Sequence, residues 1–168
     1  MSDVKKSAKF SGAYMRNSKK TMHDQLKDLK KKGVEFVKYY EMGGFNKDGT
    51  WGFDKKRPGW EKPIHKLMAD ANVTVFFHGH DHFFAKQELG CVIYQLVPQP
   101  SHPNFKNAGQ AESYGYATGK ILPNSGHLRV TVSESKVTVD YVRSYIAENE
   151  AGNRKNNEVA YSYKIVNR

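Results

Sequence analysis

Residues 73–84 of the chain read VTVFFHGHDHFF, a short apolar run followed by three histidines at alternate positions and two phenylalanines. The β-branched start of this run is typical of a buried strand. The strand follows a segment in which apolar residues recur with a helical period, at Trp60, Ile64, Leu67, Met68 and Ala71. Pro63 fits the first turn of that helix, and His65 falls off its apolar stripe. A helix leading directly into an apolar strand indicates an α/β layer.

Further strands are expected downstream. Residues 91–97, 128–132 and 137–142 are rich in β-branched side chains with partial alternation, and residues 133–135 between the last two predict a hairpin. Alternating apolar residues in 159–165 predict a final strand. Residues 41–60 combine glycines with aromatic residues, which predicts a turn-rich loop packed down over a surface. The expected fold class is therefore α/β (α+β).

Length and composition set limits on the class of protein. The 168 residues predict one domain, and 38% hydrophobic with 12% aromatic residues argues against a disordered chain. No stretch approaches the roughly 18 apolar residues of a membrane-spanning helix, so we expect no membrane partner. The Lys-rich start shows no signal peptide, which leaves the compartment unassigned. The single Cys91 excludes an intrachain disulfide and a cysteine zinc cluster, so a metal site would use His and carboxylates.

The net charge of +10 is unevenly distributed. Residues 1–33 hold ten Lys or Arg and three Asp, whereas the remainder is nearly balanced. This divides the chain into a basic, irregular or helical arm at 1–33, with a short amphipathic helix ending near residue 32, and a second part at 34–168. The charge run predicts a solvated helix face. The alternative is a patch that binds a polyanion such as the nucleic-acid backbone.

The three histidines of the opening stretch form the sharpest chemical feature of the sequence. Residues at alternate positions of an extended segment point the same way, so His78, His80 and His82 can be directed at one point. Gly79 permits a tight turn between them. Imidazole is a common ligand of zinc and iron, so the cluster predicts a metal site, with a structural hydrogen-bond cluster as the alternative. The other histidines lack such company and are expected to be structural, namely His23, His65, His102 and His127.

The segment Gly79-His80-Asp81-His82 resembles the last signature motif of the calcineurin-like metallophosphoesterases, in the branch that is similar to purple acid phosphatases. More of the chain, from about residue 34 to residue 166, resembles one group of these proteins. The matching segments are Arg57-Pro58-Gly59-Trp60, Val92-Ile93-Tyr94-Gln95, Pro98-Gln99-Pro100-Ser101, Tyr114-Gly115-Tyr116, Pro123-Asn124-Ser125-Gly126-His127 and Asp140-Tyr141-Val142-Arg143. The resemblance implies a β-sandwich of two mixed sheets flanked by helices.

The same resemblance implies a hydrolase acting on phosphate esters. In that family two metal ions of the iron, zinc or manganese type are bridged by a water or hydroxide that attacks the phosphorus atom. Two cations about 3.5–4 Å apart neutralise substrate charge and lower the pKa of the bridging water. Matched residue by residue, His80 and His82 fall on the two metal-ligand positions. Asp81 is the variable middle residue, and His78 is expected to support a ligand rather than bind the ion.

The earlier motifs of the family are absent from their expected places, so the metal centre is expected to be incomplete. The simplest hypothesis is a C-terminal fragment, the C-terminal half of the sandwich, with the remaining ligands in a missing N-terminal segment or a partner chain. Such a half would leave an apolar face uncovered. We expect the chain alone to be weakly active or inactive, and we assign no catalytic residue. The alternatives are a non-catalytic module that binds a polyanion or nucleic acid through the arm, and a single structural ion held by the three histidines.

Overall fold

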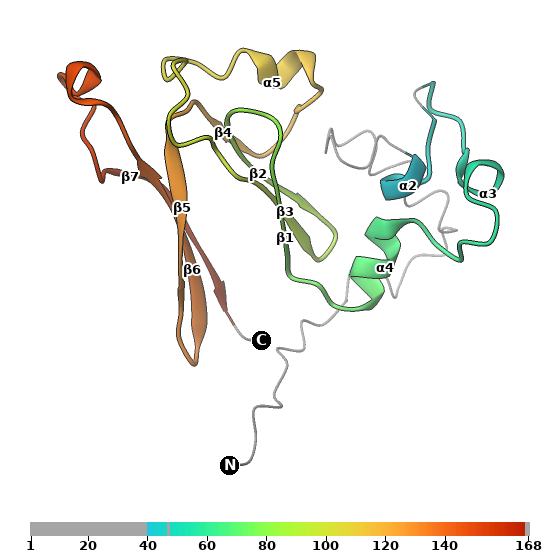
Figure 1. Ribbon diagram of the computed structural model, residues 1–168. Helices are drawn as coiled ribbons and strands as arrows, with labels where there is room; N and C mark the ends of the chain where they lie inside the picture. The colour runs from blue at the N-terminus through green and yellow to red at the C-terminus, as the bar shows by residue number, and fades with distance from the viewer. Residues whose placement is uncertain (1–39, 47, 167–168) are drawn as a thin grey trace.

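The computed structural model describes residues 40–46 and 48–166 (Figure 1). They form short helices and two β-sheets, so the α+β class is confirmed. The helices are α2 (Tyr40–Gly43), α3 (Phe53–Lys56), α4 (Ile64–Asp70), α5 (Gln110–Ser113) and the 3₁₀ turn η2 (Ala147–Asn149). The basic arm and its expected helix lie outside the described residues. None of the helices in the described part is long and apolar enough to cross a membrane.

The first sheet has the strand order β1-β3-β2-β4, with β1 (Val75–His78) parallel to β3 (Val92–Leu96). Both were expected from their apolar sequences. The strands β2 (Phe84–Leu89) and β4 (Lys120–Leu122) were not, because they carry Lys, Gln and Glu. β2 forms a tight antiparallel hairpin with β3, and β4 pairs with the other edge of β2. Polar residues are tolerated inside β2 where they find partners, as Gln87 does by donating to the carbonyl oxygen of Thr118 at 2.8 Å.

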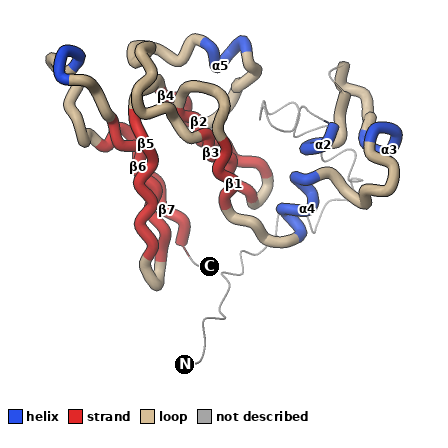
Figure 2. Tube along the Cα trace, viewed as in Figure 1, coloured by secondary structure: helices blue, strands red, loops and turns tan. Residues whose placement is uncertain are grey.

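The second sheet is antiparallel, in the order β5-β6-β7. Its strands are β5 (Gly126–Val132), β6 (Lys136–Arg143) and β7 (Val159–Val166). The expected hairpin at residues 133–135 is confirmed, and its turn is closed by the Ser133 amide donating to the Lys136 carbonyl oxygen at 2.9 Å. Figure 2 shows the strands gathered in two neighbouring sheets, with α2, α3 and α4 grouped beyond the β1 side of the first sheet.

Aromatic rings join the two sheets. Phe84 of β2 stacks on Tyr141 of β6, with 4.7 Å between ring centroids and 8° between planes, and it also meets the edge of Tyr161 on β7. Phe84 and Tyr141 are fully buried. Burial of such rings is the largest hydrophobic contribution available to a small sheet interface. The arrangement of two packed sheets is therefore held by side chains of β2, β6 and β7.

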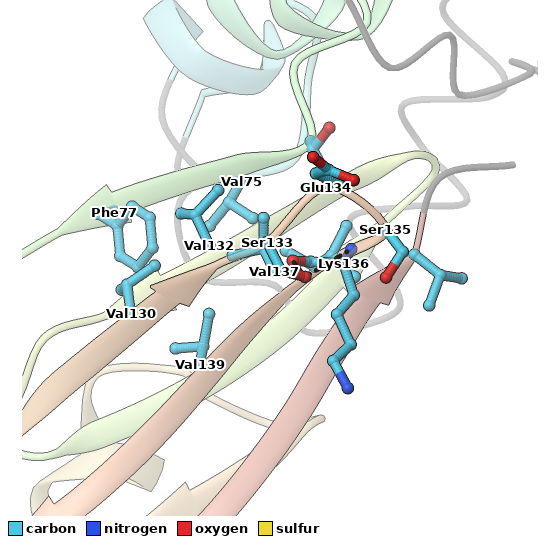
Figure 3. Close-up of a pocket in the computed structure, with 13 residues that line it drawn as sticks. Val75, Phe77, Val130, Val132, Ser133, Glu134, Ser135, Lys136, Val137 and Val139 are labelled. Atoms are coloured by element: carbon cyan, nitrogen blue, oxygen red, sulfur yellow. Dashed lines mark hydrogen bonds between the residues drawn. The ribbon is translucent and has the colours of Figure 1, made fainter.

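An apolar groove of about 520 Å³ remains between β1 and the β5–β6 hairpin (Figure 3). Val75 and Phe77 of β1 form one wall, and Val130 and Val132 of β5 form another. Phe77 is 43% exposed and Val132 is 73% exposed. A strand that pairs in parallel is usually covered on both faces. The described residues thus include an exposed apolar surface between β1 and the β5–β6 hairpin.

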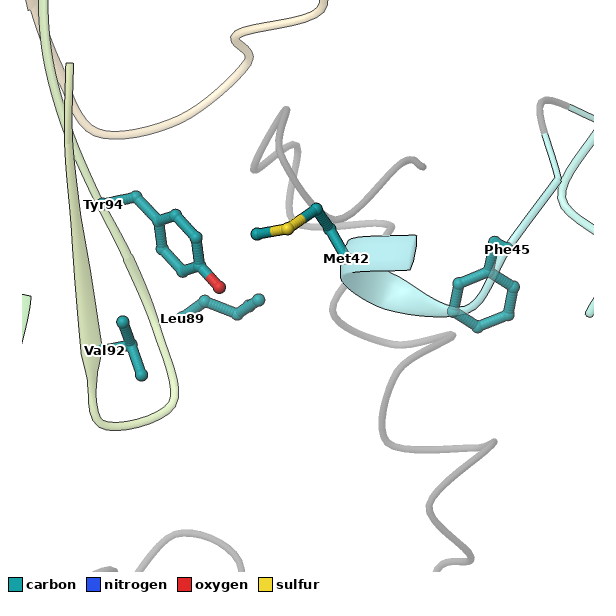
Figure 4. Packing of buried hydrophobic residues seen from close by; sticks show 5 residues of the cluster. All are labelled: Met42, Phe45, Leu89, Val92 and Tyr94. Atoms are coloured by element: carbon teal, nitrogen blue, oxygen red, sulfur yellow. The ribbon is translucent and has the colours of Figure 1, made fainter. Parts of the chain in front are cut away.

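The principal core cluster lies on the other side of the first sheet, where Tyr94 of β3 points toward Met42 of α2 (Figure 4). Helix α4 covers this cluster and confirms the predicted helix in part: it begins at Ile64 with Pro63 as its N-cap, whereas the predicted stripe began at Trp60. The predicted apolar stripe is shifted, however, because Leu67 is 45% exposed whereas His65 is 1% exposed. The Nδ1 atom of His65 lies 2.7 Å from the Tyr94 hydroxyl oxygen. This hydrogen bond allows a polar ring to take the inward position, which the helical period assigned to the outside.

Residues 41–60 form the expected turn-rich segment. An isolated bridge pairs Phe45 with Trp51, and their rings meet edge to face at 5.4 Å between centroids. Phe45 and Phe53 are buried, so the glycine-rich segment does pack its aromatic side chains inward. Gly44 has a φ of 93°, and a side chain there would collide with the Trp51 ring. The segment therefore forms the outer cover of the core cluster.

Candidate functional site

The histidine loop, residues 79–83, leaves the carboxyl end of β1 and enters β2. Because β3 lies between these strands and runs parallel to β1, the segment that leaves β3 starts at the same edge of the sheet. Loops at the carboxyl ends of parallel strands are the usual place for ligand sites in α/β sheets. The topology therefore places two loops, residues 79–83 and residues 97–103, side by side at one edge.

Two side chains anchor the histidine loop. The Tyr116 hydroxyl donates to one carboxylate oxygen of Asp81 at 2.7 Å, and the Tyr116 ring meets Phe83 edge to face at 4.9 Å between centroids. The buried amide of Asn124 donates to the carbonyl oxygen of His82 and accepts a hydrogen bond from the backbone N–H of Gln99 at 3.0 Å. Asn124 thus joins the histidine loop to the loop that follows β3.

The residues that hold Asn124 form a buried network beneath the loops. The Arg143 guanidinium donates to the Pro123 carbonyl oxygen at 2.6 Å and also to that of Asn124. It lies over the rings of Tyr141 and Tyr145, at 5.4 and 5.0 Å from their centroids. Burial raises the pKa of Tyr141, so its hydroxyl stays protonated and donates to the Pro123 oxygen at 2.6 Å. The Arg143 guanidinium and the Tyr141 hydroxyl therefore hold the backbone at Pro123 and Asn124, and with it the Asn124 side chain, which we call the Asn124 clamp.

The three histidines of the loop have different surroundings. The His80 side chain is 95% exposed, its backbone has a φ of 90°, and its Nδ1 lies 3.2 Å from the second oxygen of Asp81. His82 is also exposed. His78 lies at the end of β1 against Phe76, and burial lowers its pKa to about 4, with Asp81 opposing that shift. Two histidines are thus open to solvent, whereas the third is held inside as a neutral ring.

His102, which the sequence predicts to be structural, lies beside His82, a neighbourhood that the sequence does not predict. The two rings lie 5.0 Å apart between centroids, at 55°. The Ser125 hydroxyl donates to the His102 carbonyl oxygen at 2.8 Å, and the His102 Nδ1 accepts the Asn104 N–H at 3.1 Å. A neutral imidazole that accepts at Nδ1 carries its proton on Nε2, so His102 offers a donor rather than a ligand atom there. The pairing of β3 with both β1 and β2 brings the ends of these strands together, so no local pattern predicts that His82 and His102 are neighbours.

The histidine loop offers two exposed imidazoles, those of His80 and His82, as possible ligands for a metal. Among residues 40–46 and 48–166, no group of three or more His, Cys, Asp or Glu side chains is placed to hold one ion. The two carboxylate oxygens of Asp81 contact the Tyr116 hydroxyl and the His80 ring. The donor set suits a zinc, iron or manganese ion but forms only part of its coordination shell.

The site can therefore supply part of the coordination shell of a metal, with the Nε2–H donor of His102 beside His82. The imidazoles of His80 and His82 lie on the loop that leaves β1, His102 lies on the loop that leaves β3, and Asn124 joins the two loops. No protein-family model matches the chain, and a search of curated proteins gives no match either.

Proposed function

We propose that this chain is the C-terminal part of a metal-dependent phosphoesterase, in which His80 and His82 are metal ligands. One observation carries the proposal: a loop anchored at the carboxyl edge of a mixed sheet keeps both imidazoles exposed to solvent. Tyr116 and Asn124 hold the loop from two sides, so the backbone that carries both imidazoles is fixed. The resemblance of residues 79–82 to the last metallophosphoesterase motif supports the same assignment.

Each residue of the site has a separate role in this proposal. His80 and His82 supply nitrogen ligands, Asp81 orients the loop through Tyr116, and Asn124 fixes the backbone at His82. The Nε2–H of His102 is a hydrogen-bond donor beside His82 and would face an anionic substrate oxygen. The bound ions would supply charge neutralisation and a lowered pKa of coordinated water, which is how such centres hydrolyse phosphate esters.

The remaining ligands must come from outside the described residues, through a further segment or a partner chain. The apolar groove along β1 supports this view, because Phe77 and Val132 are open where further chain could pack. We therefore expect the chain alone to turn over phosphate esters slowly or not at all. Robust metal-dependent hydrolysis of p-nitrophenyl phosphate by the purified chain, lost in His80→Ala, would overturn this expectation of low activity and leave the metal site supported.

Metal binding tests the proposal directly. Titration calorimetry with Zn²⁺ or Mn²⁺ should show binding that weakens by about tenfold or more in His80→Ala and in His82→Ala, because each removes a ligand. Asn124→Ala should weaken it by a similar factor while leaving both imidazoles in place, because the His82 backbone loses its clamp. The matched control is His127→Ala, which removes an exposed histidine on β5 and should leave the affinity unchanged.

The metal titrations also distinguish a phosphoesterase metal site from the alternative function, a module that binds a polyanion. Unchanged metal affinity in both loop variants would refute the metal site. Salt-dependent binding of nucleic acid that disappears on deletion of residues 1–33 would then favour the module.

A further inference from the structure

Two lysines of the first sheet stand directly opposite each other. Lys86 of β2 is paired in register with Lys120 of β4. Directly paired residues of an antiparallel ladder project from the same face with their Cβ atoms about 5 Å apart, and like charges there are destabilising. Both lysines line a hollow of about 350 Å³. Its other lining residues are Glu88, Thr118, Gly119 and Tyr161.

The charges of this lysine hollow do not balance. Lys86, whose side chain is 16% exposed, pairs with Glu88. Lys120 has no carboxylate partner among the residues that the structure describes. Two ammonium groups and one carboxylate leave a net positive charge in this open hollow, where Lys86 is half-buried and Lys120 is exposed. An anion beside the two ammonium groups would offset this excess of positive charge.

Tyrosine rings of the second sheet hold both ammonium groups in place. The Lys86 Nζ lies 5.1 Å from the centroid of the Tyr163 ring, and the Lys120 Nζ lies 5.7 Å from that of Tyr161. Both tyrosines belong to β7, so the hollow is formed where β2 and β4 of one sheet meet β7 of the other. Each cation–π contact limits the freedom of a long side chain, which lowers the entropy cost of binding a ligand.

The backbone of the hollow is also fixed. Gly119 has a φ of 93°, and a Cβ at this position would collide with the carbonyl oxygen of Lys86. Glycine is therefore required for the close approach that places Lys120 beside Lys86. The neighbouring Thr118 is held through its carbonyl oxygen by the Gln87 side chain. The hollow is thus formed before any ligand arrives.

We propose that the lysine hollow binds a small, multiply charged oxyanion, namely phosphate or the phosphate group of a monoester, between the ammonium groups of Lys86 and Lys120. A dianion between them turns the repulsion of a like-charge pair into two attractive, charge-assisted hydrogen bonds. Lysine is a common phosphate ligand as a compact point charge, and the hollow has room for an ion of that size. The site uses none of the histidine-loop residues and requires no metal.

The test is a titration of the full chain with inorganic phosphate at constant ionic strength, followed through the ¹⁵Nζ resonances of lysine and through the melting temperature. The buffer is freed of metal with a chelating resin, because a soluble polycarboxylate chelator would compete for the same lysines. Phosphate should raise the melting temperature and shift the Lys86 and Lys120 resonances. Lys120→Gln, which keeps most of the aliphatic stem, should weaken phosphate binding about tenfold or more.

The matched control is Lys164→Gln, on the same strand as the tyrosines but on the opposite face by alternation, and it should bind phosphate as the native chain does. Without phosphate, Lys120→Gln should melt no lower than the native chain, because it relieves the repulsion. Phenyl phosphate distinguishes the source of the anion: tighter binding than inorganic phosphate identifies a monoester, and equal binding identifies the free ion. Undiminished phosphate binding by Lys120→Gln, or an equal effect of chloride, would overturn the proposal.

Discussion

Replacement of His65 by glutamine should remove much of the acid sensitivity of the fold. The imidazole is 1% exposed beneath α4, and its Nδ1 lies 2.7 Å from the Tyr94 hydroxyl oxygen. Its Nε2 has no partner among the described residues. Protonation would therefore place a charge in the core, with one N–H unable to donate.

The size and sign of the effect follow from the pKa. Burial lowers the pKa of His65 to about 4 from 6.5, with a smaller contribution from Lys66 in the same direction. Between these values the unfolded chain binds a proton at this site and the folded chain does not, so the free energy of unfolding rises with pH. The contribution is fully present above pH 6.5 and is lost as the pH falls toward 4. The slope is about 1.4 kcal/mol per pH unit, and the sum over the window is about 3 kcal/mol.

The assay is urea unfolding of the metal-free chain at several pH values between about 4.5 and 7.5. The native chain should lose stability on acidification through His65 and, by a comparable amount, through His78, because burial lowers the pKa of both rings to about 4. His65→Gln should lose about 1.4 kcal/mol per pH unit of that dependence, whatever its stability at pH 7.5. His127→Gln, which changes an exposed histidine, should retain the native slope. An unchanged slope in His65→Gln would show that this ring is not the buried neutral group that the contacts indicate.

Two further results are expected. Phe84→Ala should lower the free energy of unfolding by about 3–5 kcal/mol in urea titrations, because it removes the ring that stacks on Tyr141 between the sheets, and a loss under 1 kcal/mol would contradict that packing. Arg129→Gln should raise the pKa of Asp140, measured by carbon-detected NMR. That pKa is held below its usual range by the Ser162 hydroxyl and next by the Arg129 guanidinium, so a residual depression should remain in the variant, and a complete return would contradict the Ser162 contribution.

The sequence alone predicted the elements whose local pattern and tertiary role agree. The apolar strands β1 and β3, the hairpin of β5 with β6, the alternating β7 and the helix α4 were all expected near their observed spans. β-Branched runs and turn residues favour these conformations before any long-range contact forms.

The tertiary structure decided the features that depend on pairing between distant segments. β2 reads as a polar segment, and it becomes a strand because β3 and β4 satisfy both of its edges. His65 lies inside because Tyr94 of β3 meets its ring, although the helical period alone placed it outside.

The histidine loop and the lysine hollow also differ in how much of each could be predicted from the sequence, because strand pairing brings distant residues together. The histidine motif could be read from the sequence because its residues are neighbours on the chain. The position of His102 beside His82, and of Lys120 beside Lys86, depends on strand register and on which strands pair. A local pattern sets which face a side chain occupies, whereas only the folded sheet sets what lies opposite it.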